Sequence, residues 1–167
     1  MALRPVPESA ASGPLTVWQG TVLPAWVDYN GHMNDACYMV AFSLATDALM
    51  GHVGLDAAGR AATGHSIFTL EAHINYLGEV AEGVAIEVRT QILGSDAKRM
   101  HIYNSMHRAG EPALLAANEQ MLLNVDMRTR RSARFAPSVA PRVLALSTAH
   151  RDLPWPEYAG RRMGLPA

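Results

Sequence analysis

The chain has 167 residues and a mass of 18.0 kDa, and 49% of its residues are hydrophobic. This length suits one domain with a sizeable core and is too short for two ordinary domains. With 14 basic and 15 acidic residues and a pI of about 6.6, the chain lacks the positive footprint of a nucleic-acid-binding protein, so no nucleic-acid partner is expected.

The N-terminal segment predicts a flexible arm followed by a strand. Residues 1–14 contain several prolines but no continuous apolar stretch, so we expect neither a signal peptide nor a membrane anchor there. Residues 16–23 are typical of a strand, which ends at Pro24 because proline cannot continue a central ladder. The single cysteine, Cys37, excludes an intrachain disulfide and favours a reducing, cytoplasmic compartment.

A long apolar run from Met33 to about Val53 predicts a buried helix. At about 18 residues with polar interruptions, this helix is a core element rather than a membrane span, and no membrane partner is expected. Asn34 is placed to cap it, because an Asn side chain accepts a hydrogen bond from the free N–H groups at a helix start.

The rest of the chain predicts a sheet. A Gly- and Ala-rich connection, residues 54–64, precedes four segments in which apolar and polar residues alternate with the period of a strand. These segments are residues 67–77, 84–93, 98–108 and 114–127. One strand, a buried helix and four further strands predict an α+β fold in which a five-stranded antiparallel sheet wraps around a central long helix.

These elements divide the chain into three predicted parts. Residues 1–14 form the arm, residues 15–130 the folded domain and residues 131–167 a C-terminal tail. Within the tail we expect a short helix that ends at about His150.

The most informative segment is residues 28–38, at the start of the predicted helix. A carboxylate, Asp28, stands just before a glycine turn at Gly31, and the turn opens into the apolar helix. An ionised side chain could therefore lie beside the free backbone N–H groups of a helix start. That pairing suits attack on a carbonyl carbon.

The element order and the pattern Asp28-x-x-Gly31-His32-Met33-Asn34-x-x-x-Tyr38 resemble the hotdog-fold acyl-CoA thioesterases of the 4-hydroxybenzoyl-CoA thioesterase type. Residues 24–34, 71–80 and 159–162 are similar to the betainyl-CoA thioesterases of carnitine breakdown, a narrower likeness. The resemblance implies a hotdog fold, an acyl-CoA substrate with betainyl-CoA first, and a homodimer or homotetramer. The alternatives are an aromatic or fatty acyl-CoA thioesterase and a non-catalytic acyl-CoA-binding protein of the same fold.

Thioester hydrolysis requires a nucleophile or base and donors for the oxyanion. Asp28 is the candidate carboxylate, which either attacks the carbonyl or deprotonates a water. The backbone N–H groups of Gly31, His32 and Met33 are the predicted oxyanion donors, and the side chains of His32 and Asn34 are candidates to orient water or substrate. A structural alternative stays open, in which Asp28 forms an Asx-turn, Asn34 caps the helix and His32 is a structural histidine.

Two further carboxylates are candidates for the site. Glu119 shares its strand face with apolar neighbours, so it is either buried with a partner, in support of His32 or Asn34, or brought into solvent by a bulge near Asn118. Glu71 lies on the polar face of its strand. In a hotdog dimer that region borders the site of the neighbouring subunit, whereas the alternative for Glu71 is a solvated surface.

Aromatic side chains near the motif are candidates to bind the acyl group, because aromatic faces and carboxylates recognise a quaternary ammonium. They are Trp26, Tyr29, Tyr38 and Tyr76. Alternatively they are core residues or line a slot for a planar or medium-chain acyl group.

The CoA phosphates need cations, and Arg128 and Arg130, just past the last strand, are the candidates, with a solvated strand end as the alternative. The histidines show no metal-ligand spacing and no phosphate-loop pattern occurs, so neither a metal nor a cofactor is expected.

Overall fold

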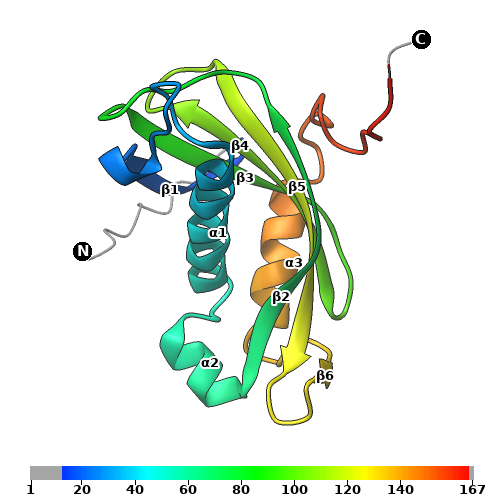
Figure 1. Cartoon of the computed structure of the whole chain (residues 1–167). Coiled ribbons are helices and arrows are strands. Elements are labelled where there is room, and N and C mark those ends of the chain that lie inside the picture. The colour runs from blue at the N-terminus through cyan, green and yellow to red at the C-terminus, as the bar shows by residue number, and fades with distance from the viewer. Residues whose placement is uncertain (1–12, 166–167) are drawn as a thin grey trace.

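The computed structural model describes residues 13–165, so most of the predicted arm lies outside the described residues. An antiparallel sheet curls around a long central helix, α1 (Figure 1). The strands are β1 Leu15–Thr21, β2 His65–Tyr76, β3 Ala85–Ser95, β4 Arg99–Arg108, β5 Leu114–Asp126 and β6 Arg131–Ser132. The helices are the 3-10 turn η1 Pro24–Trp26, α1 Asp35–His52, α2 Ala57–Thr63 and α3 Ala140–Ala149.

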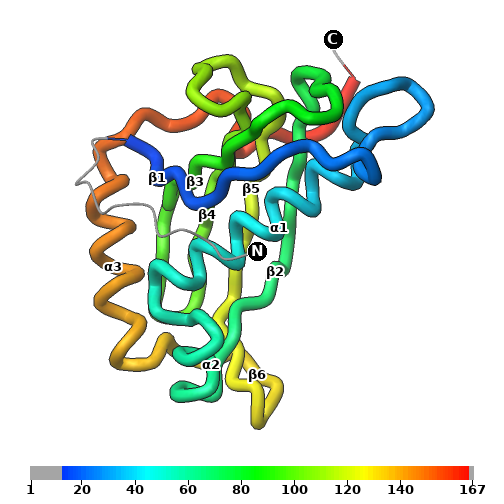
Figure 2. The backbone as a smooth tube through the Cα atoms, turned by 90° about the vertical axis from the view of Figure 1, so that its left-hand side faces the viewer, coloured from blue at the N-terminus to red at the C-terminus, as the bar shows by residue number. Residues whose placement is uncertain are grey.

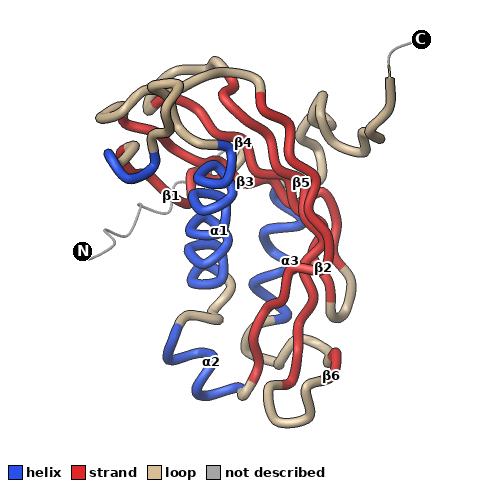
Figure 3. The backbone as a smooth tube through the Cα atoms, viewed as in Figure 1, coloured by secondary structure: helices blue, strands red, loops and turns tan. Residues whose placement is uncertain are grey.

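The strands, red in Figure 3, lie in the order β1-β3-β4-β5-β2. Every pairing between them is antiparallel. The predicted α+β hotdog fold and its five strands are therefore confirmed. The very short β6 was not predicted and pairs with β5 beyond the main path of the sheet. In the described chain β2 forms one outer edge of the sheet.

Helix α1 forms where the apolar run predicted it, with Asn34 as its N-cap. The Oδ1 atom of Asn34 accepts a hydrogen bond from the Ala36 N–H at 3.0 Å. Phe42, Ala45 and Leu49 are fully buried against the concave face of the sheet. The opposite side of α1 stays exposed in the described chain, where Val40 is 44% and Leu44 39% exposed, so the prediction of a helix buried on all sides is only partly met.

The Gly- and Ala-rich connection at residues 54–64 contains a helix that the sequence did not predict, α2. Asp56 caps this helix by accepting from the Gly59 N–H at 2.8 Å, and Gly64 ends it with a φ of 69°. A short Ala-rich helix has too few apolar positions to show a helical period. Within the described residues no single helix is long and apolar enough to span a membrane, and α1 and α2 satisfy that test only as a pair bent by 61°.

The short helix predicted in the tail is confirmed as α3, which runs beside the part of β3 that β1 does not reach (Figure 2). His150 at its end fixes the contact, since its Nδ1 atom accepts the Ile92 N–H at 2.9 Å. Phe135, Val139 and Val143 belong to the hydrophobic core. The residues after α3 continue onto the sheet face that points away from α1, where the Gln91 side chain donates to the Pro154 carbonyl.

Candidate active site

The turn before α1 holds Asp28 in a defined orientation. The Asp28 N–H donates to the His32 carbonyl at 3.1 Å, and Gly31, with a φ of 83°, donates its N–H back to the Asp28 carbonyl at 3.0 Å. Oδ1 of Asp28 accepts the Asn30 N–H at 2.8 Å, so the Asx-turn of the structural alternative is present. Oδ2 has no hydrogen-bond partner within residues 13–165. The turn therefore orients the carboxylate and leaves one of its oxygens available.

Asp28 lines a pocket of about 550 Å³ between the turn, the start of α1 and the segment that follows β2. Its lining includes most of the predicted site residues from the turn and helix. These residues are Asp28, Tyr29, Asn30, His32, Met33, Asn34, Asp35, Tyr38, Tyr76, Leu77, Gly78 and Glu79.

Two of the three predicted oxyanion donors are wrong, because their N–H groups are already bonded. Gly31 donates to Asp28, and Met33 donates to the Val80 carbonyl at 2.8 Å. Within the described chain the N–H groups of His32 and Asp35 have no acceptor. Asp35 is the first residue of α1, where the free N–H groups and the helix dipole favour negative charge. These two N–H groups are candidate donors for an oxyanion.

His32 and Asn34 are both in the pocket but contact different groups. Nε2 of His32 lies 3.6 Å from Oε1 of Glu79, a residue that sequence reasoning missed. Oδ1 of Asn34 is used in capping α1, as the structural alternative proposed. Nothing in the local sequence links Glu79 to this turn, because the link is the non-local bond from Met33 to Val80.

Two of the predicted aromatic side chains pack together on one wall of the pocket. The rings of Tyr38 and Tyr76 meet edge to face at 5.4 Å, and their hydroxyls donate to the carbonyls of Gly78 and Asp35. Burial raises the pKa of both phenols, helped by the charge of Glu79 at Tyr38 and of Asp35 at Tyr76, so both stay protonated at neutral pH.

The other two aromatic predictions have different outcomes. Tyr29 lines the pocket but is 96% exposed. Trp26 does not line this pocket and packs, partly buried, against the hydrophobic core, so its binding of the acyl group stays a prediction. The 3-10 turn η1 turns the chain here, which the sequence pattern did not reveal.

Glu119 does not contact His32 or Asn34 in the turn that carries Asp28, so the prediction that it supports them is wrong within one chain. The neighbouring side chains of Asn118 and Gln120 contact α1, and the alternation of a strand therefore places Glu119 on the opposite face. There its two oxygens bind His101 Nε2 at 2.6 Å and the Gly160 N–H at 2.7 Å. The bulge proposed near Asn118 is also wrong, since the ladders on both sides of β5 continue through Glu119.

Glu71 lies away from Asp28 in the single chain. It lines a smaller pocket with His73, His101 and Glu119, on the face of the sheet that points away from α1. Its predicted place beside a neighbouring subunit's site stays a prediction.

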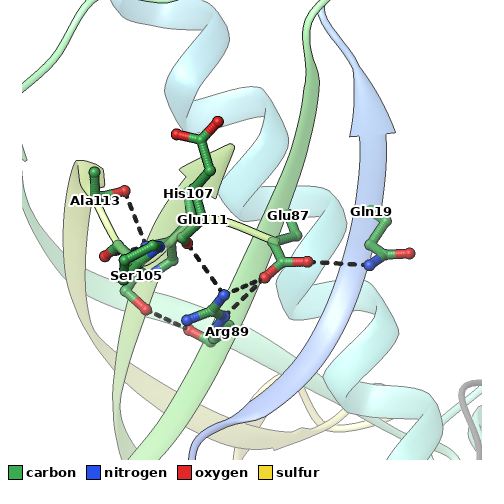
Figure 4. Close-up of polar contacts among 8 residues, drawn as sticks. Gln19, Glu87, Arg89, Ser105, His107, Glu111 and Ala113 are labelled. Carbon is green, nitrogen blue, oxygen red and sulfur yellow. Dashed lines mark hydrogen bonds and ion pairs between the residues drawn. The ribbon is translucent and has the colours of Figure 1, made fainter. Parts of the chain in front are cut away.

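A second polar cluster, missed in the sequence, lies on this outer face, and hydrogen bonds connect its side chains (Figure 4). Glu87, only 6% exposed, accepts hydrogen bonds from Arg89 on its own strand and from Gln19 on β1. Burial alone would raise the pKa of Glu87, but these hydrogen bonds and the Arg89 charge outweigh it and lower that pKa. The His107 Nδ1 atom bonds to the carbonyls of Pro112 and Ala113. The cluster is structural.

Arg128 and Arg130 lie in the hairpin after β5, far from the pocket. The start of β2 pairs with Asp126 beside this hairpin, whereas Tyr76, at the far end of β2, lines the pocket. Within one chain they lie at the end of β2 opposite the pocket, and their binding of the CoA phosphates stays a prediction. No group of three His, Cys, Asp or Glu side chains in residues 13–165 is arranged to hold a metal ion.

Comparison with known proteins gives consistent matches. The family described as the thioesterase-like superfamily matches residues 22–143. A betainyl-CoA thioesterase of Pseudomonas aeruginosa strain PAO1 is 56% identical over 152 residues, which cover 91% of this chain and 96% of that protein. An L-carnitine dehydrogenase/betainyl-CoA thioesterase of Rhizobium meliloti strain 1021 is 40% identical over 92% of this chain, which spans 31% of that longer protein. A Staphylococcus aureus protein solved in complex with CoA is 29% identical with a TM-score of 0.83, covering 92% of this chain and 97% of that one.

Proposed function

Because the chain belongs to the thioesterase-like superfamily, we propose that it hydrolyses betainyl-CoA to betaine and CoA. The observation that carries the reaction is the Asp28 carboxylate, with one oxygen available, in a pocket that also holds the free N–H groups at the start of α1. The 56% identity to a betainyl-CoA thioesterase over nearly the whole of both chains supports this substrate.

Asp28 acts on the thioester carbonyl by one of two routes. In the first, Oδ2 attacks the carbonyl carbon, CoA leaves as the thiolate, and water hydrolyses the resulting anhydride. In the second, Asp28 removes a proton from a water that attacks directly. In both routes the carbonyl oxygen becomes negative, and we assign the stabilisation of that charge to the unbonded N–H groups of His32 and Asp35.

We further propose that the enzyme works in the cytoplasm as a homodimer or homotetramer. The long edge strand β2 has no neighbour on its outer side in the described chain, and an unpaired edge is a template for pairing with another chain. Antiparallel pairing of β2 with a second copy brings the start of one strand beside the end of the other. It thereby moves Glu71 and the arginine hairpin of one copy toward the pocket of the other.

Release of free thiol by the purified protein, measured across a panel of acyl-CoA esters, tests the function. We expect the highest kcat/KM with betainyl-CoA. Preference for a neutral aromatic or long-chain ester would replace this substrate with the alternative class, and no release from any ester would leave a non-catalytic acyl-CoA-binding protein. Sedimentation or light scattering tests the oligomer, which is contradicted by a monomer at assay concentration.

A further inference from the structure

The pocket around Asp28 is acidic. Asp28, Asp35 and Glu79 line it, and none of its described lining residues is a lysine or arginine. The cation beside it, Arg108, donates from Nη2 to the main-chain carbonyl of Glu79 at 3.2 Å and is not part of the lining. A neutral acyl group gains nothing from this concentration of negative charge, whereas a cationic one is attracted by it.

Two of the three carboxylates have no task in the proposed chemistry. Asp28 reacts, but the side chain of Asp35 accepts only the neighbouring Ala36 N–H, and Glu79 approaches only His32. The Glu79 side chain is 80% exposed, so no packing requirement explains its place at the pocket. Both carboxylates are therefore free to face a ligand.

Tyr76 places an aromatic face beside these charges. Tyr76 is 48% exposed and lines the pocket, and its hydroxyl donates to the Asp35 carbonyl at 3.2 Å, which holds the ring at the start of α1. A quaternary ammonium has no N–H to donate, so it is bound by aromatic faces and by charges that need not form hydrogen bonds.

We propose that Asp35, Glu79 and the ring of Tyr76 are the specificity-determining residues, which select an acyl group carrying a fixed positive charge close to the thioester. The inference rests on the proposed acyl-CoA hydrolysis and adds to it the residues that distinguish a cationic acyl group from a neutral one of the same shape. The selection is electrostatic, so it acts on binding and orientation of the acyl group rather than on the reacting carbonyl.

The test compares betainyl-CoA with 3,3-dimethylbutyryl-CoA, in which a quaternary carbon replaces the quaternary nitrogen. The two esters have the same shape and differ in charge. The measured quantity is the ratio of their kcat/KM values, because a variant that merely disturbs the fold lowers both values together. We expect the wild-type ratio to favour betainyl-CoA strongly and to fall as the salt concentration rises.

Glu79→Gln and Asp35→Asn should each lower this ratio roughly tenfold, and Tyr76→Leu should lower it roughly threefold, mainly through loss of betainyl-CoA turnover. Glu82→Gln is the matched control. Glu82 is exposed in the same segment between β2 and β3 but does not line the pocket. The ratio of the two kcat/KM values in Glu82→Gln should therefore match that of the wild type.

The outcomes separate this inference from the function on which it rests. An unchanged ratio in both Glu79→Gln and Asp35→Asn overturns the inference while hydrolysis stands. A wild-type enzyme that cleaves the two esters equally well also overturns it. No cleavage of any acyl-CoA ester overturns the proposed function itself and the inference with it.

Discussion

The carboxylates of the pocket and those of the outer sheet face differ in how fully they are bonded. On the outer face, Glu87 and Glu119 use both oxygens in hydrogen bonds to protein groups. In the pocket, Asp28 keeps one oxygen without a partner, and Glu79 is mostly exposed. A fully bonded carboxylate stabilises the fold, whereas one with an available oxygen can act on a ligand. The predictions below follow from this difference, in order of expected size.

Asp28→Asn should lower kcat by roughly a thousandfold, because an amide is neither a nucleophile nor a base at neutral pH. The Asn side chain keeps the oxygen that accepts the Asn30 N–H, so the turn should remain intact. Thiol release measures the loss, and circular dichroism and size-exclusion chromatography check the fold and the oligomer. Turnover at the wild-type rate in a folded variant would refute the role of Asp28.

Arg89→Met should destabilise the protein by about 3 kcal/mol, because it leaves the buried Glu87 carboxylate without its cation. Urea unfolding measures the change. Arg99→Gln is the matched control, because it removes the exposed ion pair with Asp96 and should cost less than about 1 kcal/mol. Equal losses from the two variants would contradict the structural role of the outer-face cluster. Neither arginine lines the pocket, so turnover of the folded protein should not change.

Glu119→Ala should loosen the segment after α3, because Glu119 is the acceptor for the Gly160 N–H. Trypsin cleavage at Arg161 and Arg162 should become roughly tenfold faster, which corresponds to about 1.4 kcal/mol. Glu157→Ala, an exposed change in the same segment, is the control and should leave the cleavage rate unaltered. If both variants are cleaved at the wild-type rate, Glu119 does not hold the segment.

Lowering the pH should lower the free energy of unfolding through His150, which connects the end of α3 to β3. Burial lowers the pKa of His150, and its Nδ1 atom must stay unprotonated to accept the Ile92 N–H. In the unfolded chain a histidine titrates near about 6.5, so the unfolded state binds the proton first as the pH falls. Stability should be complete above that value and fall as the pH drops through the lower folded pKa.

Urea midpoints at several pH values between 7.5 and 5.5 check this effect, which should be smaller than that of Arg89→Met. Burial also lowers the pKa of His107, so its contribution has the same sign. In His150→Gln the slope should become smaller by the contribution of His150, while the contribution of His107 stays. An unchanged slope in that variant would show that His150 does not titrate in this window.

Sequence reasoning succeeded where the signal is local. The alternation of apolar and polar residues predicted the five long strands, and the apolar run with Asn34 before it predicted α1 and its cap. The motif around Asp28 and three short segments indicated the betainyl-CoA thioesterases, and the identity of 56% to one of them confirms that resemblance.

Sequence reasoning failed where the answer depends on residues distant in the chain. The N–H groups of Gly31 and Met33 looked available, but the Met33 N–H is bonded to Val80, which follows β2. Glu119 looked like a support for the catalytic turn, but the face of β5 that meets α1 is the one with Asn118 and Gln120. Strand parity alone does not tell which face meets the helix when both faces carry polar residues.

The sequence by itself determined the five long strands, α1, α3 and the family, and it singled out Asp28 as the candidate carboxylate, because periodicity, capping and a compact motif are properties of neighbouring residues. Only the tertiary structure decided which N–H groups remain free for an oxyanion and which carboxylates are already paired. It also decided that Glu79 faces the pocket that contains Asp28 and Asp35. These facts depend on hydrogen bonds and packing between segments far apart in the chain, which form only when the sheet closes around α1.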